Sequence, residues 1–199
     1  MIFKPPGASP AVLSFRRAKQ MHQPTIEPMG EPDVAAVAQL RLATFFEGTE
    51  RTLEEDAAGL RDLLGGDGFE AALVARIDDT PVGTCLLVRH ELEPAHDLTP
   101  WLAGLVVGAM YRRRGIATAL VKATEAHAAS QGVETLYLYT WDARAFYAAL
   151  GWNTVEIFGS DGERMALMSR RLGNMIPKGG VLVFGKRPGK QRTYNLPAR

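Results

Sequence analysis

The spacing of apolar residues predicts four helices in the chain. In chain order they cover residues 34–46, 52–65, 116–131 and 143–150. Asp33 is the expected N-cap of the first helix, and Asp142 is a candidate N-cap of the fourth. The second helix opens with Thr52-Leu53-Glu54-Glu55, a capping box in which the threonine and the second glutamate bond each other's backbone amides.

Shorter apolar segments predict strands over residues 25–29, 69–77, 82–89, 101–107, 134–140, 153–158 and 164–170. Asp78-Asp79-Thr80-Pro81 separates the second strand from the third and predicts a hairpin. Strand 101–107 is apolar throughout, which is typical of a central, buried strand. In strand 134–140, leucines at 136 and 138 alternate with tyrosines at 137 and 139, so the two kinds of residue face opposite sides of the sheet.

The order of these elements predicts an α/β or α+β domain with a mixed sheet, covering residues 25–172. Residues 1–24 are proline-rich without sustained periodicity, and we expect an extended N-terminal arm. Residues 173–199 form a basic C-terminal extension. Its segment 181–195 could close as a hairpin, because Pro188-Gly189 suits the centre of a type II turn.

Composition favours a cytoplasmic globular protein. Of the 199 residues, 46% are hydrophobic and 23% are charged. The single cysteine, Cys85, excludes an intramolecular disulfide framework. No run of 18 apolar residues occurs, and the N-terminus lacks the apolar region of a secretory signal, so we expect no membrane association.

The formal net charge of +1 conceals an asymmetry along the chain. Residues 1–25 carry four cations and no acid, and residues 173–199 carry six cations and no acid. The remaining 13 Lys and Arg face 22 Asp and Glu, a net charge of −9. An acidic centre argues against a general nucleic-acid-binding surface on the domain and suits a cationic amine as substrate.

The candidate chemistry lies where strand 101–107 ends and the helix from 116 begins. The first amides of a helix have no intrahelical partner, and the helix dipole adds partial positive charge. Three cations, Arg112, Arg113 and Arg114, flank that point, and Gly115 lets a ligand approach the backbone closely. This arrangement predicts a diphosphate site. Taken alone, the stretch fits equally well a glycine turn that carries solvated arginines.

Two segments resemble the GNAT superfamily of N-acetyltransferases. W-L-A-G-L-V-V-G-A-M-Y-R-R-R-G-I-A-T-A-L resembles the family's strand, pyrophosphate loop and helix, and L-Y-L-Y-T-W-D-A-R-A-F-Y-A-A-L-G-W resembles its next strand and helix. The resemblance is strong over residues 100–152 and weaker over 25–172. The loop departs from the family pattern at Ala109, where proline is common, and at Arg113 and Ala117, where glycine is common.

The resemblance implies a mixed, largely antiparallel sheet of six to seven strands with about four helices, and acetyl-CoA as acetyl donor. It implies that the sheet splays open beside strand 101–107 and that this strand pairs with the pantetheine arm through Leu105, Val106 and Val107. Asp142 would lie near the pantetheine. The pyrophosphate would be held by Arg112, Arg113, Arg114, Gly115, Ile116, Ala117 and Thr118.

By the same resemblance, Tyr147 is the expected catalytic residue. A phenol beside the departing thiolate can protonate it or stabilise it by hydrogen bonding. Phe146 and Leu150 are four residues apart and share a helix face, whereas Tyr147 is rotated from Phe146 by about 100° and can point elsewhere. The alternative is a core tyrosine with a hydrogen-bonded hydroxyl.

The general base is open, because strand 101–107 contains no acid. The candidates, each of which also fits a solvated surface role, are Glu47, Glu50, Glu91, Glu93 and His96. The acceptor pocket is expected to draw on Phe45, Phe46, Glu47, Glu50, residues 91–100, Tyr137 and Tyr139. His22, His90 and His127 show no metal-ligand spacing, so we expect no metal site.

The sequence therefore predicts an acetyl-CoA-dependent N-acetyltransferase, an acyltransferase of the EC 2.3.1 type. Its partner would be a primary amine of a small molecule or a peptide, and a homodimer is one expected assembly. The base-poor site leaves open a non-catalytic acyl-CoA-binding regulatory domain of the same fold. A more remote alternative is a nucleic-acid-binding protein that uses the arginine run and the basic tails.

Overall fold

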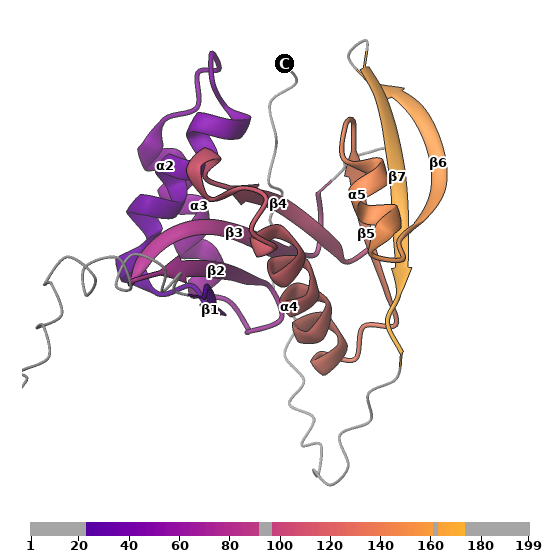
Figure 1. The fold of residues 1–199 in the computed structure, drawn as a ribbon, viewed down its shortest axis with the longest axis horizontal. Coiled ribbons are helices and arrows are strands. Elements are labelled where there is room, and N and C mark those ends of the chain that lie inside the picture. The colour runs from indigo at the N-terminus through magenta and orange to yellow at the C-terminus, as the bar shows by residue number, and fades with distance from the viewer. Residues whose placement is uncertain (1–22, 92–96, 161–162, 174–199) are drawn as a thin grey trace, which may run out of the picture.

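Residues 23–91, 97–160 and 163–173 are described by a computed structural model (Figure 1). Their seven strands form one sheet in the order β1-β2-β3-β4-β5-β7-β6. The strands are β1 Thr25–Pro28, β2 Ala71–Ile77, β3 Thr80–Val88, β4 Trp101–Val107, β5 Thr135–Thr140, β6 Asn153–Ser160 and β7 Glu163–Arg171. All neighbours run antiparallel except β4 and β5.

Four α-helices lie within the described residues: α2 Val34–Phe45, α3 Leu53–Leu64, α4 Ile116–Ser130 and α5 Arg144–Ala149. Two 3-10 turns, η2 Glu31–Asp33 and η3 Ala109–Tyr111, accompany them. The predicted mixed, largely antiparallel sheet with about four helices is therefore confirmed. The predicted N-terminal arm, apart from its last two residues, and the hairpin over 181–195 lie outside the described residues.

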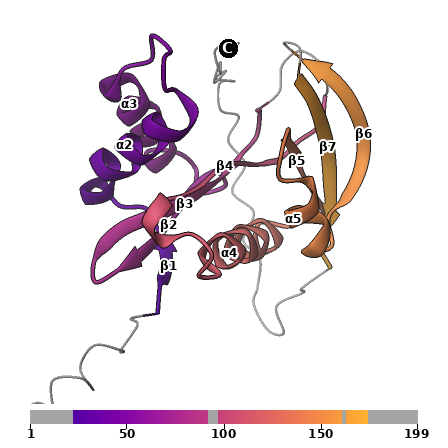
Figure 2. The same cartoon turned by 45° about the horizontal axis from the view of Figure 1, so that its top comes forward.

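The helices cover both faces of the sheet (Figure 2). Helices α2 and α3 pack on one face over a core that includes Val34, Leu60 and Trp101. Helix α4 packs on the other face, where Leu120 and Leu136 are fully buried. Strand β5 alternates as predicted, with its leucines in the α4 core and its tyrosines against the α2–α3 core.

The predicted capping box at the start of α3 is confirmed. The Glu55 amide donates to Thr52 Oγ1 over 3.2 Å, and the Thr52 amide donates to Glu55 Oε2 over 2.8 Å. Asp33 precedes α2 as predicted, but its carboxylate caps no amide of that helix. It accepts instead from the Gly30 amide and from Arg76 of β2, because Arg76 lies beside it.

Two connections differ from their predictions. The hairpin turn contains only Asp78 and Asp79, with φ of 50° and 62°, rather than four residues. Aspartate tolerates this left-handed conformation, which a two-residue hairpin turn of type I′ requires. The expectation that Asp142 caps α5 is wrong. Asp142 is exposed, Ala143 is the N-cap residue of α5, and no side chain caps the helix. The Ala143 amide donates to the Thr140 hydroxyl over 3.0 Å.

Candidate active site

Strands β4 and β5 form an open seam in the middle of the sheet. Their ladder contains one residue pair, Trp101 with Tyr137, next to which the Tyr137 amide donates to the Pro100 carbonyl over 3.1 Å. Beyond this pair the two strands diverge toward their C-terminal ends (Figure 1). The predicted splaying of the sheet is therefore observed in the described structure.

A bulge in β4 accompanies this divergence. Thr84 of β3 pairs with Val106 and Leu86 pairs with Ala103, so that two residues of β4 oppose one of β3. Gly104 lies in the bulge with φ of 56°, a left-handed conformation that favours glycine. A bulge bends its strand. It therefore turns the following segment, which includes Val106 and Val107, away from β5.

The connection from β4 to α4 presents a row of unpaired amides. Arg113 and Gly115 both have positive φ, 61° and 78°, and the first backbone bond of α4 runs from the Ala119 amide to the Gly115 carbonyl. Within the described structure, the amides of residues 113–118 find no protein acceptor. A Cβ placed on Gly115 would meet nothing within 4 Å. This helix terminus is therefore open to an anion.

The three arginines of this connection have different surroundings. Arg112 Nε donates to the Val107 carbonyl over 3.0 Å. Arg114 Nη2 donates to the Met110 carbonyl over 3.0 Å, and its guanidinium stands 5.5 Å from the ring of Tyr111. Arg113 is exposed and has no such contact within the described residues. Two arginines thus brace the loop, whereas the third is free to bind a phosphate.

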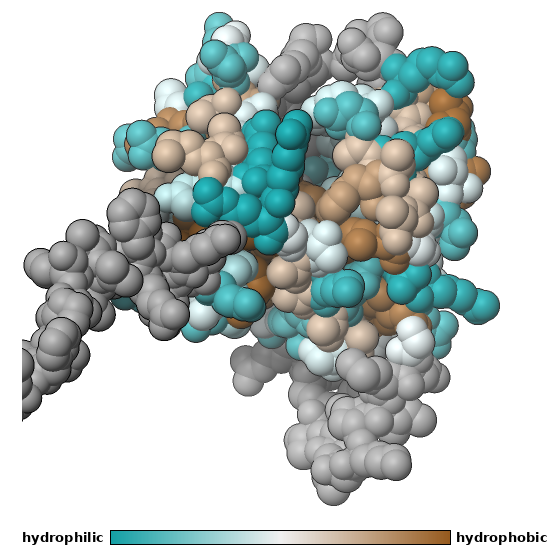
Figure 3. All heavy atoms as spheres, viewed as in Figure 1, coloured by the Kyte–Doolittle hydropathy of each residue, from teal (hydrophilic) through white to brown (hydrophobic). Residues whose placement is uncertain are grey.

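The residues predicted to bind coenzyme A come together at the C-terminal end of β4. Residues 112–118 surround the unpaired amides, and Leu105, Val106 and Val107 lead into them along the open edge of β4. In the space-filling view, strongly hydrophilic residues gather over the segment between β4 and α4, beside a hollow (Figure 3). Asp142 follows β5, the other strand of the open seam, and is exposed. A pantetheine arm with a pyrophosphate fits these groups.

Tyr147 of α5 is buried on the α4 face of the sheet. Its ring packs between Phe146 and Trp152, with centroids 5.0 and 5.9 Å away. Burial, followed by the charges of Cys85 and Asp142, raises the pKa of the Tyr147 phenol well above its usual value. Its hydroxyl makes no hydrogen bond within the described structure, which does not support the alternative of a hydrogen-bonded core tyrosine. Tyr147 is therefore a neutral phenol whose hydroxyl bonds no group of the described residues.

Glu91 acts electrostatically on Tyr139, which packs on the α2–α3 side of the sheet. Burial raises the pKa of Glu91 from 4.5 to about 7, against the charge of Arg41, which lowers it. Burial and then the charge of Glu91 raise the pKa of Tyr139. Of the other candidate bases, Glu47 and Glu50 are exposed, while Glu93 and His96 lie outside the described residues. Glu91 is thus the candidate whose environment tunes it for proton transfer near neutral pH.

A buried charged cluster, not predicted from the sequence, interacts with Glu91 through Arg41. Asp56 of α3 is 1% exposed and accepts from Arg41 Nε at 2.9 Å and Nη2 at 3.3 Å. Arg51 Nε approaches the other side of the same carboxylate at 3.2 Å. Helical spacing could have revealed part of the cluster, because Arg41 follows the core residue Val37 by one turn and therefore lies on the buried face of α2.

Cys85 is fully buried in β3 opposite the β4 bulge. Burial raises the pKa of its thiol to about 12, so the thiol stays protonated at neutral pH and is a poor nucleophile. Within the described ranges, no group of three or more His, Cys, Asp or Glu residues is arranged to hold a metal ion. The same ranges contain no helix with the length and apolar character needed to cross a bilayer.

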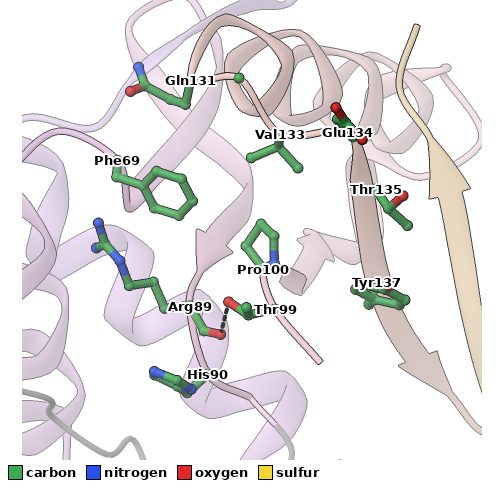
Figure 4. Close-up of a pocket in the computed structure, with 11 residues that line it drawn as sticks. Phe69, Arg89, His90, Thr99, Pro100, Gln131, Val133, Glu134, Thr135 and Tyr137 are labelled. Carbon is green, nitrogen blue, oxygen red and sulfur yellow. Dashed lines mark hydrogen bonds between the residues drawn. The ribbon is translucent and has the colours of Figure 1, made fainter. Parts of the chain in front are cut away.

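A second hollow, with a cavity volume of about 580 Å³, lies at the other ends of β4 and β5. Arg89 and His90 line one side and Tyr137 the other, with Pro100 between them (Figure 4). Arg89 is already paired with the carboxylates of Asp67, at 2.7 Å, and Glu70, at 3.5 Å. This hollow thus offers no unpaired arginine and is separated from the unpaired amides by the length of the strands.

Comparisons with solved structures identify the same fold in known acetyltransferases. A GNAT superfamily phosphinothricin acetyltransferase from Sinorhizobium meliloti, in complex with AcCoA, matches with a TM-score of 0.65 at 16% identity, covering 75% of this chain and 89% of that one. An aminoglycoside 6'-N-acetyltransferase complexed with coenzyme A matches at 0.61 and 19% identity, covering 74% and 97%. A ribosomal-protein-alanine N-acetyltransferase from Brucella melitensis matches at 0.61 and 20% identity, covering 74% and 99%.

Comparison of the sequence with curated proteins gives no match. The model of the acetyltransferase (GNAT) family matches residues 34–152, which is more than half of the chain. The matched segment contains the open seam, the unpaired amides and Tyr147. The chain therefore belongs to the GNAT family of acetyltransferases, and its general chemistry is acetyl transfer from acetyl-CoA.

Proposed function

We propose that this protein is an N-acetyltransferase that moves the acetyl group of acetyl-CoA directly to a primary amine of a small molecule or a peptide. One observation carries the proposal. Tyr147 lies on one face of the sheet that contains the open seam, and on the other face Glu91, whose pKa burial raises to about 7, interacts electrostatically with Arg41 and with Tyr139 of β5. Such a pair suits a reaction in which one proton is removed and another is supplied.

The chain's own groups fit the coenzyme. The amides of residues 113–118 and the side chain of Arg113 would bind the pyrophosphate, and the free edge of β4 at 105–107 would align the pantetheine. When bound, acetyl-CoA supplies an activated acetyl thioester. Because residues 105–107 immediately precede the pyrophosphate loop, the thioester would enter the seam rather than the hollow at the far ends of the strands.

Glu91 would act as the general base. The ammonium form of an amine cannot attack a carbonyl, so one proton must leave before or during attack. A carboxylate with a pKa of about 7 accepts this proton more readily than an ordinary glutamate does. The Arg41 charge keeps part of the Glu91 population ionised at neutral pH, in opposition to burial.

Tyr147 would act as the general acid. In the step, the amine nitrogen forms a bond to the carbonyl carbon, the carbon–sulfur bond breaks, and the sulfur leaves with the electron pair. The Tyr147 hydroxyl would donate its proton to this sulfur, since no group among the described residues accepts a hydrogen bond from it. With Cys85 held as a thiol, direct attack by the amine is favoured over a cysteine-bound acetyl intermediate.

The experiment is a turnover assay with the full chain. Release of coenzyme A thiol from acetyl-CoA is measured over polyamines, aminoglycosides, amino acids and peptides with an N-terminal alanine. The proposal expects acetylation of at least one primary amine, which Tyr147→Phe and Glu91→Gln both slow. Acetyl-CoA binding without turnover over the whole panel would instead support the regulatory alternative. Salt-sensitive binding to a short duplex at about 50 mM salt would support the nucleic-acid alternative.

A further inference from the structure

Two guanidinium groups share one buried carboxylate beside the proposed reaction centre. Arg41 and Arg51 both contact Asp56, with their Nε atoms 2.9 and 3.2 Å from its oxygens. Phe46 flanks both cations, 6.0 Å from Arg41 and 4.8 Å from Arg51. The three charged side chains therefore carry one positive charge in excess, in surroundings that include an aromatic ring and a helix interface.

Several N–H groups of the two arginines have no hydrogen-bond acceptor among the described residues. Arg41 uses Nε and Nη2 for Asp56, while its Nη1 lies against Gly104 in the β4 bulge and bonds no group of the described structure. Arg51 Nε is buried and has no hydrogen-bond partner, despite its short distance to Asp56. The terminal nitrogens of Arg51 likewise bond nothing in the described ranges. The terminal N–H groups of the two arginines that bond no described acceptor can bind an anionic group of a ligand.

Glu91 provides the opposite charge. The charge of Arg41 acts to lower the pKa of Glu91 against the larger effect of burial, so the two groups interact electrostatically. They form no ion pair within 4.0 Å among the described residues, so the carboxylate and the guanidinium are separated. The site therefore has a negative group on one side and unfilled cationic donors on the other. A ligand that bears a positive and a negative group close together complements this arrangement.

We propose that the acceptor is an amine that carries a carboxylate next to its amino group, as a free α-amino acid does, and that Arg51 and Arg41 bind this carboxylate. The inference rests on the proposed N-acetyltransferase function. In this arrangement the amino group of the acceptor lies near Glu91, and its carboxylate accepts hydrogen bonds from the free N–H groups of Arg51 and Arg41. A polycation would place its additional charges against two arginines, and the N-terminus of a peptide has no adjacent carboxylate.

The test compares matched acceptors with the full chain. Initial rates are measured for neutral L-amino acids, for their carboxamides and for the corresponding decarboxylated amines. A charged hydrogen bond contributes about 1.5–3 kcal/mol, so the amino acid should exceed its carboxamide in kcat/KM by about tenfold or more. Carboxamides, amines or aminoglycosides that are acetylated as well as the amino acids, or better, would overturn the inference and leave the proposed function intact.

Arg51→Gln is the diagnostic variant, because it leaves the two bonds between Arg41 and Asp56 in place. It should remove the preference for amino acid over carboxamide, measured as the ratio of their kcat/KM values, mainly by raising the KM of the amino acid. Arg51→Lys keeps the charge and should restore part of the preference. Arg61→Gln is the matched control, since Arg61 is an exposed residue of α3 paired with Glu31. A preference that survives in Arg51→Gln contradicts the assignment.

Absence of turnover with every amine would contradict the proposed function, and a binding measurement then decides the inference. With coenzyme A present, calorimetry compares an N-acetyl amino acid with its N-acetyl carboxamide. Tighter binding of the acid, lost in Arg51→Gln but retained in Arg61→Gln, supports the carboxylate site. Equal binding of the two compounds overturns it.

Discussion

The guanidinium of Arg41 lies directly against the backbone of Gly104, so that a Cβ on Gly104 would overlap the Arg41 Nη1 atom. This contact joins α2 to the bulge of β4, immediately before the strand edge that we assign to the pantetheine arm. Because Asp56 holds the other two nitrogens of Arg41, the guanidinium cannot move aside without losing a buried ion pair. The contact thus couples the charged cluster to the seam.

Gly104→Ala should therefore disturb both stability and turnover. The added methyl meets Arg41 and approaches Leu86 Cδ1 at 3.3 Å, and the φ of 56° is unfavourable for alanine. We expect a loss of about 2–4 kcal/mol in the free energy of unfolding, of which the left-handed backbone accounts for about 1 kcal/mol. Gly48→Ala is the control, because Gly48 has φ of 79° and open space around it. Urea denaturation that gives both variants the same loss in the free energy of unfolding would contradict the contact between Gly104 and Arg41.

Tyr147→Phe should lower kcat at least tenfold, a loss of about 1.4 kcal/mol in transition-state stabilisation, because the thiolate leaves without its proton donor. The phenylalanine keeps the packing against Phe146 and Trp152, so the Kd of acetyl-CoA should hardly change. Stopped-flow turnover and calorimetric binding separate the two effects. Tyr111→Phe removes a hydroxyl from the connection between β4 and α4 and serves as comparison. Wild-type kcat in Tyr147→Phe would exclude the residue from the mechanism.

Glu91 should shape the pH profile of the reaction. Only its ionised form accepts a proton, so kcat/KM should rise as the pH increases through about 7, the pKa to which burial raises this carboxyl. In Glu91→Gln this rise of kcat/KM with pH should disappear, and the remaining rate should be low. Glu134→Gln changes an exposed glutamate immediately before β5 and should keep the wild-type profile. If kcat/KM of Glu91→Gln still rises with pH as in the wild type, another group is the general base.

The same carboxyl predicts a pH dependence of stability. Its pKa is about 7 in the folded protein and 4.5 as an ordinary glutamate, so between these values the folded state binds more protons than the unfolded state. The free energy of unfolding should therefore fall as the pH rises from about 4.5 to about 7, by at most about 3 kcal/mol from this group. Glu91→Gln should be more stable than wild type at pH 8 and lose this advantage at pH 4. Denaturant titrations at several pH values measure the difference, which parallel curves for the two proteins would contradict.

Local patterns predicted most elements because each depends on residues close in sequence. The apolar run at 101–107 coincides with β4, and the Thr52–Glu55 capping box fixes the start of α3. The alternation of Leu136 and Tyr137 also assigned the two faces of β5 correctly. The unpaired amides after Arg112 follow from the strand, glycine and helix order alone, so they were predictable as well, whereas the anion that they bind stays a prediction.

Features that depend on distant segments could not be predicted in the same way. The pKa of Glu91 results from burial and from Arg41 of another element, and neither leaves a trace in the residues around position 91. The pairing of Arg41 with Asp56 joins two helices across a loop. Asp142 was misjudged as a cap because α5 begins one residue later than the pattern indicated, with Ala143 at the N-cap position and no side chain that caps the helix.

Arg113→Gly should change stability and affinity in opposite directions. Arg113 has φ of 61°, where glycine is unstrained, so the substitution should raise the free energy of unfolding by about 0.5–1 kcal/mol. It also removes the one arginine of the loop that no described group engages, and acetyl-CoA affinity should fall several-fold, by about 1 kcal/mol. Arg113→Ala loses the charge but keeps the unfavourable backbone, so it should bind as weakly without being stabilised. Melting curves and calorimetry on both variants decide the matter, and unaltered affinity in both would remove Arg113 from the phosphate site.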